Sequence, residues 1–148
     1  MDIPRFLANT IEKDLGKQKV IMLYGSRRVG KTTLIRDIAE RHQQDVLLLQ
    51  GEDMNVIALL QQRTIANYER LLRNKKILII DEAQVIPNIG KSLKLMIDNI
   101  KDITIIATGS SSFDLISSAG EPLVGRQLVY QLYPIAQAEL SSVEDLLT

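Results

Sequence analysis

The chain has 148 residues, of which 45% are hydrophobic, a size and content that support one domain with a substantial core. Eighteen basic and eighteen acidic side chains leave no net charge, so the composition does not support a surface built to hold nucleic acid. The chain has no cysteine, which excludes a disulfide scaffold, and no apolar stretch of the roughly 20 residues that span a bilayer, so we expect a cytoplasmic protein without membrane contact.

The first predicted element is an amphipathic helix within residues 1–16. Apolar residues recur there at steps of three and four, Asp2 precedes them as a candidate N-cap, and Gly16 follows as a stop. We expect this helix to pack across the edge of a sheet, ahead of the first strand.

A phosphate-binding pattern follows the first predicted strand. Residues 20–24 are an apolar run suited to a buried strand, and residues 25–32 have the pattern G-x-x-x-x-G-K-[ST], known as the P-loop. The glycines allow backbone N–H groups to turn inward around a polyphosphate, and a helix that begins near the lysine adds the positive end of its dipole. The residues expected to bind nucleotide are Gly25, Ser26, Arg27, Arg28, Val29, Gly30, Lys31, Thr32 and Thr33.

Two side chains of this loop have separate predicted tasks. Lys31 is a mobile positive charge that can reach the β- and γ-phosphates of a nucleotide, and Thr32 supplies a hydroxyl suited to Mg²⁺. A glycine-rich turn that binds nothing is the alternative. The complete eight-position pattern, with an apolar strand before it and helical spacing after it, disfavours that alternative.

A second buried strand is predicted over residues 46–49, and Gly51, Glu52 and Asp53 close it. Two acids at a strand end could reach Mg²⁺ or a partner, although capping of the next helix by Asp53 is the simpler role. Residues 55–73 have the spacing of two short helices.

The second chemical signal is a run of aliphatic residues, 77–80, that ends in Asp81 and Glu82. A strand that is apolar on both faces belongs inside a parallel sheet, and such sheets bind ligands at the carboxyl ends of their strands. Asp81 could hold Mg²⁺ through water, and Glu82 could orient and deprotonate the water that attacks a γ-phosphate. Capping of the next helix is the alternative for both acids. Gln84 is a weaker candidate for a group near that water.

A further buried strand, residues 103–108, leads into a run of hydroxyl side chains. If this strand neighbours the P-loop strand, a hydroxyl at its end would lie beside the γ-phosphate and sense its presence. Thr108 and Ser110 are the candidates, and a plain turn made of serines is the alternative.

Arg126 lies on a predicted loop before the last strand, residues 127–132. An arginine supplied to a γ-phosphate, from the same chain or from a neighbouring subunit, neutralises charge in the transition state. An ion pair with Glu121 or contact with solvent is the simpler alternative, and the residues alone favour it. Residues 135–148 have the spacing of a final amphipathic helix.

Six segments in this order resemble the prokaryotic AAA+-like ATPases, in which the ATPase domain is followed by a C-terminal domain of unknown function. The segments are GSRRVGKTTL, ILIIDEAQVIP, LKLMID, IIATGSSSFDL, GEPLVGR and QLYPI. The resemblance implies that the P-loop binds ATP and Mg²⁺, that Asp81 and Glu82 are the Walker B acid and the catalytic glutamate, and that Ser110 is the sensor. It also implies a phosphate-directed or interface role for Arg126.

The sequence departs from that family in two respects. Ser26 stands where proline is frequent and Arg28 where glutamine is common, and neither change disturbs the phosphate cradle. The family's C-terminal region is missing, so we expect residues 1–148 to be a fragment or a minimal domain that forms a single ATPase domain, and no nucleic-acid contact of that region is carried over.

These patterns together predict a three-layer α/β P-loop NTPase fold, with a parallel sheet of about five strands in the order 5-1-4-3-2 and helices on both faces. The predicted function is binding of Mg-ATP and its hydrolysis to ADP and phosphate, as a conformational switch for a protein partner or for self-association. A nucleotide-binding module without turnover is the alternative, and a small-molecule kinase is a weaker one because no arginine-rich lid is visible. A GTPase is disfavoured because the chain lacks an N-K-x-D motif.

Overall fold

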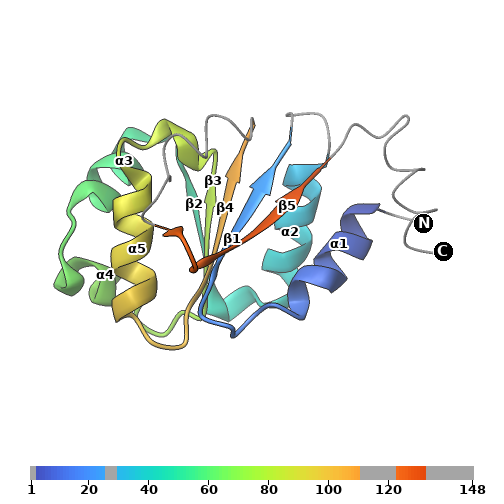
Figure 1. Ribbon diagram of the computed structural model, residues 1–148, viewed down its shortest axis with the longest axis horizontal. Helices are drawn as coiled ribbons and strands as arrows, with labels where there is room; N and C mark the ends of the chain where they lie inside the picture. The colour runs from blue at the N-terminus through green and yellow to red at the C-terminus, as the bar shows by residue number, and fades with distance from the viewer. Residues whose placement is uncertain (1–2, 26–29, 111–122, 133–148) are drawn as a thin grey trace.

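Five parallel strands form one sheet in the computed structural model, which describes residues 3–25, 30–110 and 123–132, with side chains from residue 7 onward. The strands are β1 (Val20–Tyr24), β2 (Val46–Gln50), β3 (Ile77–Asp81), β4 (Thr104–Gly109) and β5 (Gln127–Gln131). Their order across the sheet is β2-β3-β4-β1-β5, and every neighbouring pair is parallel (Figure 1). The predicted order 5-1-4-3-2 is therefore confirmed, counted from the opposite edge.

The strands differ in burial, and the prediction of a buried strand over residues 46–49 is wrong, because β2 lies at the edge of the sheet. Strands β1 and β4 are buried along their whole length, and β3 is buried up to its last residue, Asp81. The edge strands β2 and β5 alternate between partly buried and exposed positions. Aliphatic side chains on both faces of β1, β3 and β4 suit the interior of a parallel sheet, because helices cover both of its faces.

Helices cover both faces of the sheet, which gives three layers (Figure 1). On one face lie α1 (Ile3–Glu12) and α2 (Lys31–Arg41), and on the other lie α3 (Met54–Gln61), α4 (Ile65–Leu71) and α5 (Ile89–Asn99). Two single-turn 3₁₀ helices, η1 (Gln43–Asp45) and η2 (Ala83–Val85), precede β2 and follow β3. The predicted three-layer α/β architecture, with helices on both faces of a parallel sheet, is thus confirmed.

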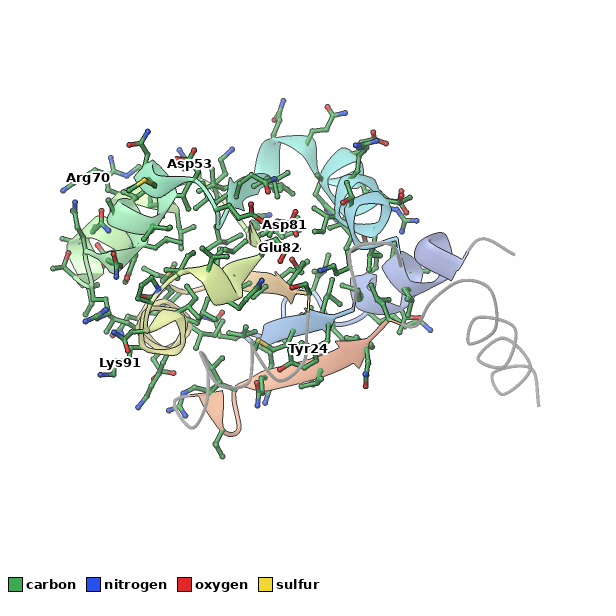
Figure 2. The ribbon with its side chains drawn as sticks, turned by 90° about the horizontal axis from the view of Figure 1, so that it is seen from above. Tyr24, Asp53, Arg70, Asp81, Glu82 and Lys91 are labelled. Carbon is green, nitrogen blue, oxygen red and sulfur yellow. The ribbon has the colours of Figure 1, made fainter. Side chains whose placement is uncertain are left out.

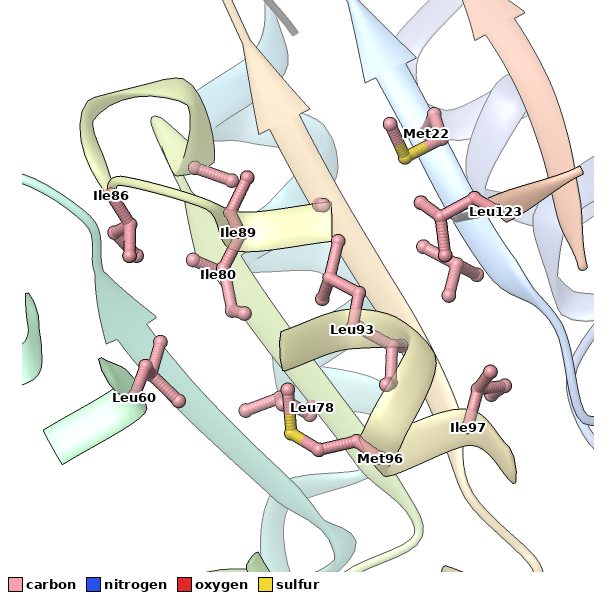
Figure 3. Close-up of a cluster of buried hydrophobic side chains, with 14 of the residues drawn as sticks. Met22, Leu60, Leu78, Ile80, Ile86, Ile89, Leu93, Met96, Ile97 and Leu123 are labelled. Carbon is pink, nitrogen blue, oxygen red and sulfur yellow. The ribbon is translucent and has the colours of Figure 1, made fainter. Parts of the chain in front are cut away.

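The larger hydrophobic core lies between the sheet and α5. Leu93, Met96 and Ile97 of α5 pack against Leu78 and Ile80 of β3 (Figure 3). Each fully buried side chain of this size contributes roughly 1.5–3 kcal/mol relative to an exposed one. This packing fixes β3, and with it the two acids at its end.

The first helix differs from its prediction at its C-terminal end. It ends at Glu12, because the backbone N–H groups of Asp14 and Leu15 bond to carbonyls three residues earlier, at 2.8 and 3.3 Å, in a tighter turn. Gly16 ends this turn with a φ of +86°, as its role as a stop requires. The predicted helix over 135–148 lies outside the described residues. Within the described residues, no helix combines the length and the apolar content that crossing a bilayer requires.

A hydrogen bond joins the segment after α1 to the edge strand β5. The hydroxyl of Tyr130 donates to Asp14 Oδ2, and Lys17 Nζ lies 2.8 Å from Asp14 Oδ1. Burial alone would raise the pKa of Asp14, but the hydrogen bonds from Lys17 and Tyr130 outweigh it and lower that pKa. Burial, followed by the bond to Asp14, raises the pKa of Tyr130 to about 12.

We expect Tyr130→Phe to lower the free energy of unfolding at pH 7 by about 1–2 kcal/mol, because it removes a hydrogen bond to a carboxylate. The raised pKa of Tyr130 stabilises the fold below pH 10, and this contribution is lost as the pH rises toward 12. The lowered pKa of Asp14 stabilises the fold above pH 4, and that contribution is lost in acid. Urea unfolding at several pH values measures both effects.

The control is Gln131→Ala, at an exposed position on the same strand. It should leave stability nearly unchanged at every pH. A Tyr130→Phe variant with the wild-type free energy of unfolding, and with the wild-type loss of stability between pH 10 and 12, would contradict this account.

Candidate active site

Three strands bring the predicted site residues to one edge of the sheet. Because β1, β3 and β4 are parallel, their carboxyl ends meet there, and Figure 2 views the molecule from this side, with Asp81 and Glu82 near its centre. Tyr24 lies beside Gly109 in the register of β1 and β4, and the N–H of Gly25 donates to the carbonyl of Gly109 at 3.1 Å. The P-loop therefore begins beside the end of β4, as the sequence predicts.

The turn of the P-loop meets α2 at Gly30, which has a φ of +88° and forms the N-cap of that helix. This left-handed conformation suits glycine, which has no β-carbon. The carbonyl of Gly30 accepts from the N–H of Leu34 at 3.0 Å, so α2 begins at Lys31, where the sequence places it. Residues 26–29 lie outside the described residues, and they include Arg27 and Arg28, which the sequence predicts to bind nucleotide.

Lys31 and Glu82 form a buried ion pair. Lys31 Nζ lies 3.1 Å from Glu82 Oε1, and the two residues are 3% and 9% exposed. An ammonium or carboxylate group buried without a partner costs several kcal/mol, so each of these charges keeps the other in place. The P-loop and the end of β3, which lie 51 positions apart in the chain, are thereby joined.

Thr108 holds the backbone and the side chain of the two acids. Its hydroxyl accepts from the N–H of Glu82 at 2.9 Å and donates to Asp81 Oδ1 at 2.5 Å. Thr108 is fully buried, and Glu82 has φ and ψ of 54° and 51°, an unusual conformation for a residue with a β-carbon. The structure thus places Thr108, predicted as a sensor, behind the acids, where it fixes their positions.

Gln84 and Ser110 complete the described part of the site. Gln84 Nε2 lies 2.7 Å from Glu82 Oε2 and 3.3 Å from Ser110 Oγ. The carboxylate of Glu82 therefore has Lys31 on one oxygen and Gln84 on the other. The structure thus brings Glu82, Gln84 and Ser110 together.

Thr32 and Asp81 line one pocket of about 360 Å³ between α2 and the ends of β2 and β3. A hydroxyl and a carboxylate are hard oxygen donors, the kind that Mg²⁺ prefers. The described residues hold no group of three or more His, Cys, Asp or Glu side chains arranged to bind a metal. Mg²⁺ usually binds one or two carboxylates and keeps water and phosphate oxygens as its other ligands.

Gly51 is a residue whose importance the sequence does not reveal. Its N–H donates to the carbonyl of Asp81 at 2.6 Å, and a β-carbon on it would lie 2.2 Å from the carbonyl oxygen of Glu82. Only glycine fits this close approach of two backbones.

Asp53, two residues later, accepts from the N–H of Asn55 at 2.8 Å, so its helix-capping role is confirmed.

Arg126 lies at the end of the sheet where the strands begin, opposite the end that carries the site residues. It precedes β5, and its carbonyl accepts from the N–H of Val20, the first residue of β1, at 2.8 Å. A five-residue strand, about 16 Å long, therefore separates it from the P-loop. Its Nε lies 2.6 Å from Asp98 Oδ1, and the expected partner Glu121 is outside the described residues. Action on a phosphate in its own chain does not fit this position, and action from a neighbouring subunit stays a prediction.

Comparisons with known proteins give the family. The chain matches an AAA domain family, AAA_14, over residues 17–141. It is 31% identical over 128 residues to MJ1544, an uncharacterized protein of Methanocaldococcus jannaschii, across 84% of this chain and 29% of that protein. It is 27% identical over 139 residues to Rv2008c, an uncharacterized protein of Mycobacterium tuberculosis, across 93% of this chain and 30% of that protein. The chain thus spans less than a third of these relatives.

Two solved structures share the fold. Domain III of the Thermotoga maritima replication initiation protein DnaA has a TM-score of 0.63 at 20% identity, covering 96% of this chain and 66% of that one. Thermotoga maritima RuvB has a TM-score of 0.55 at 21% identity, covering 84% and 44%. At these identities the likeness shows the fold alone. Because the family match extends over residues 17–141, this chain belongs to that family of AAA domains.

Proposed function

We propose that this domain binds Mg-ATP and hydrolyses it to ADP and phosphate. The observation that carries the proposal is the buried ion pair between Lys31 of the P-loop and Glu82 at the end of β3. A buried lysine at the start of a helix, beside a left-handed glycine, suits the phosphates of a nucleotide. A carboxylate at the same point suits activation of the attacking water.

The proposed roles follow from the positions of the side chains. The first N–H groups of α2 and the ammonium of Lys31 bind the phosphates, and Thr32 and Asp81 hold Mg²⁺, which neutralises charge on the phosphates when bound. When Lys31 turns to the phosphates, Glu82 Oε1 is released from the ion pair and can accept a proton from water. Thr108 keeps the backbone of Glu82 fixed during this exchange.

The move of Lys31 from Glu82 to the phosphates is also the proposed conformational switch. Binding of nucleotide changes what holds Glu82, and Glu82 is followed directly by η2, whose Val85 is exposed. We propose a protein partner or a second copy of the chain as the receiver of this change, and we place the protein in the cytoplasm. A nucleic-acid partner is not proposed, because the chain has no net charge.

Glu82→Gln is expected to lower phosphate release from Mg-ATP by about 10² to 10⁴-fold, because the amide cannot accept the proton of water. Steady-state phosphate release and binding of a fluorescent ATP analogue measure turnover and occupancy separately. Binding should persist, since the residues that contact the phosphates are unchanged. The control is Glu69→Gln, an exposed position on α4, which should behave as wild type.

Other outcomes separate the alternatives. Tight binding without phosphate release from wild-type protein would contradict hydrolysis and favour the module that binds nucleotide without turnover. Transfer of the γ-phosphate to an added small-molecule acceptor would favour the kinase.

Thr108→Val should lower the turnover number by about tenfold or more, since the hydroxyl that positions both acids is lost. It should also lower the free energy of unfolding by about 1–3 kcal/mol, because the N–H of Glu82 loses its partner. Thr104→Val is the matched control, since Thr104 lies at the opposite end of β4 and accepts from the N–H of Gly16 at 2.9 Å. That variant should lose stability but keep its turnover number, and an equal loss of turnover in both would contradict the assignment.

A further inference from the structure

We propose that Gln84 is a positioning residue that couples Ser110, at the end of β4, to the catalytic carboxylate of Glu82, at the end of β3. The inference rests on the hydrolysis proposed above and adds a residue that links two of its parts. Its basis is the side-chain amide of Gln84, which reaches both strand ends, with Nε2 2.7 Å from Glu82 Oε2 and 3.3 Å from Ser110 Oγ.

The chemistry of the amide allows both contacts at once. A glutamine NH₂ group carries two hydrogens, so one can go to the carboxylate and the other to the hydroxyl oxygen. The bond to the carboxylate is shorter, as expected for a charged acceptor. Gln84 lies in the single turn η2, two residues after Glu82, and is only partly buried.

The two hydrogen bonds of Gln84, to Glu82 Oε2 and to Ser110 Oγ, form a bridge between the strand ends. This bridge holds a different oxygen of Glu82 from the one that Lys31 holds. Lys31 holds Glu82 Oε1 and must leave it when it binds phosphates, whereas Gln84 contacts the other carboxylate oxygen, Oε2. After Lys31 has left, the bond from Gln84 still orients the carboxylate through Oε2. A glutamate side chain otherwise has several rotamers, and fixing one of them before reaction lowers the barrier.

The far end of the bridge lies beside the P-loop. Ser110 follows Gly109, whose carbonyl accepts from the N–H of Gly25, the first residue of the P-loop. A shift of Ser110 when the loop binds phosphate would move the amide of Gln84, and through it the carboxylate. The bridge therefore supplies a path from the presence of phosphate to the orientation of Glu82.

Kinetics of a double-mutant cycle test the coupling. Gln84→Met keeps the length of the side chain but removes its hydrogen bonds, and Ser110→Ala removes the acceptor. We expect Gln84→Met to lower kcat about tenfold, with KM and the affinity for ADP within about twofold of wild type, because no phosphate contact is lost. The double variant should be no slower than the slower single variant, since both remove one bridge.

A spectroscopic signal tests the bridge without turnover. In the nucleotide-free protein, the side-chain amide signals of Gln84 can be assigned in a ¹H–¹⁵N spectrum by their loss in Gln84→Met. They should shift in Ser110→Ala and in Glu82→Gln, and should stay in place in Val85→Ala, which changes an exposed side chain of the same turn. Gln61→Met, at an exposed position on α3, is the control for the glutamine substitution itself.

The results distinguish this inference from the proposed function. Wild-type kcat in Gln84→Met, or independent, multiplying effects of the two single variants, would overturn the coupling while hydrolysis by Glu82 stands. Side-chain amide signals of Gln84 that do not shift in Ser110→Ala would overturn the bridge itself. Wild-type protein that releases no phosphate would contradict the proposed function, and the positioning role of Gln84 would then fail with it, whatever the amide signals show.

Discussion

The ion pair between Lys31 and Glu82 is the interaction on which the rest of the site depends. Both residues are buried, so neither charge is tolerable without a partner. The pair joins the first turn of α2 to the end of β3, and Thr108 and Gln84 are arranged around its acidic member. Anything that takes Lys31 away, as phosphates would, must change the surroundings of Glu82. Binding and activation of the site are in this account one event.

The topology of the sheet makes this pair possible. Strand β4 lies between β1 and β3, and this places the residue that follows β4 between the P-loop and the acids. Because β1, β4 and β3 are parallel, their carboxyl ends lie on one side of the sheet. The packing of α5 against β3 fixes the position of β3 in the sheet. The same parallel arrangement puts Arg126 on the opposite side, because it precedes its strand instead of following it. A role for Arg126 at a phosphate thus requires a second chain.

Much of this arrangement could be predicted from the sequence. The five strands follow from apolar runs, whereas their order and the convergence of Lys31, Asp81, Glu82 and Ser110 follow from the P-loop pattern and from what the resemblance to AAA+-like ATPases implies. Roles that depend on distances between particular atoms could not be predicted. Thr108 holds both acids, and Gly51 fits against the backbone of Glu82. A polar residue within a buried strand signals that a partner exists, but only the register identifies the partner.

The most direct test of the central claim is a crystal structure of the domain with Mg²⁺ and a non-hydrolysable ATP analogue. We expect that Lys31 Nζ leaves Glu82 Oε1, from which it lies 3.1 Å without nucleotide, and lies within hydrogen-bond distance of a phosphate oxygen, while Gln84 keeps its contact with Glu82. A nucleotide bound with the Lys31–Glu82 ion pair intact would contradict it, since occupancy of the site would then leave the catalytic carboxylate unchanged.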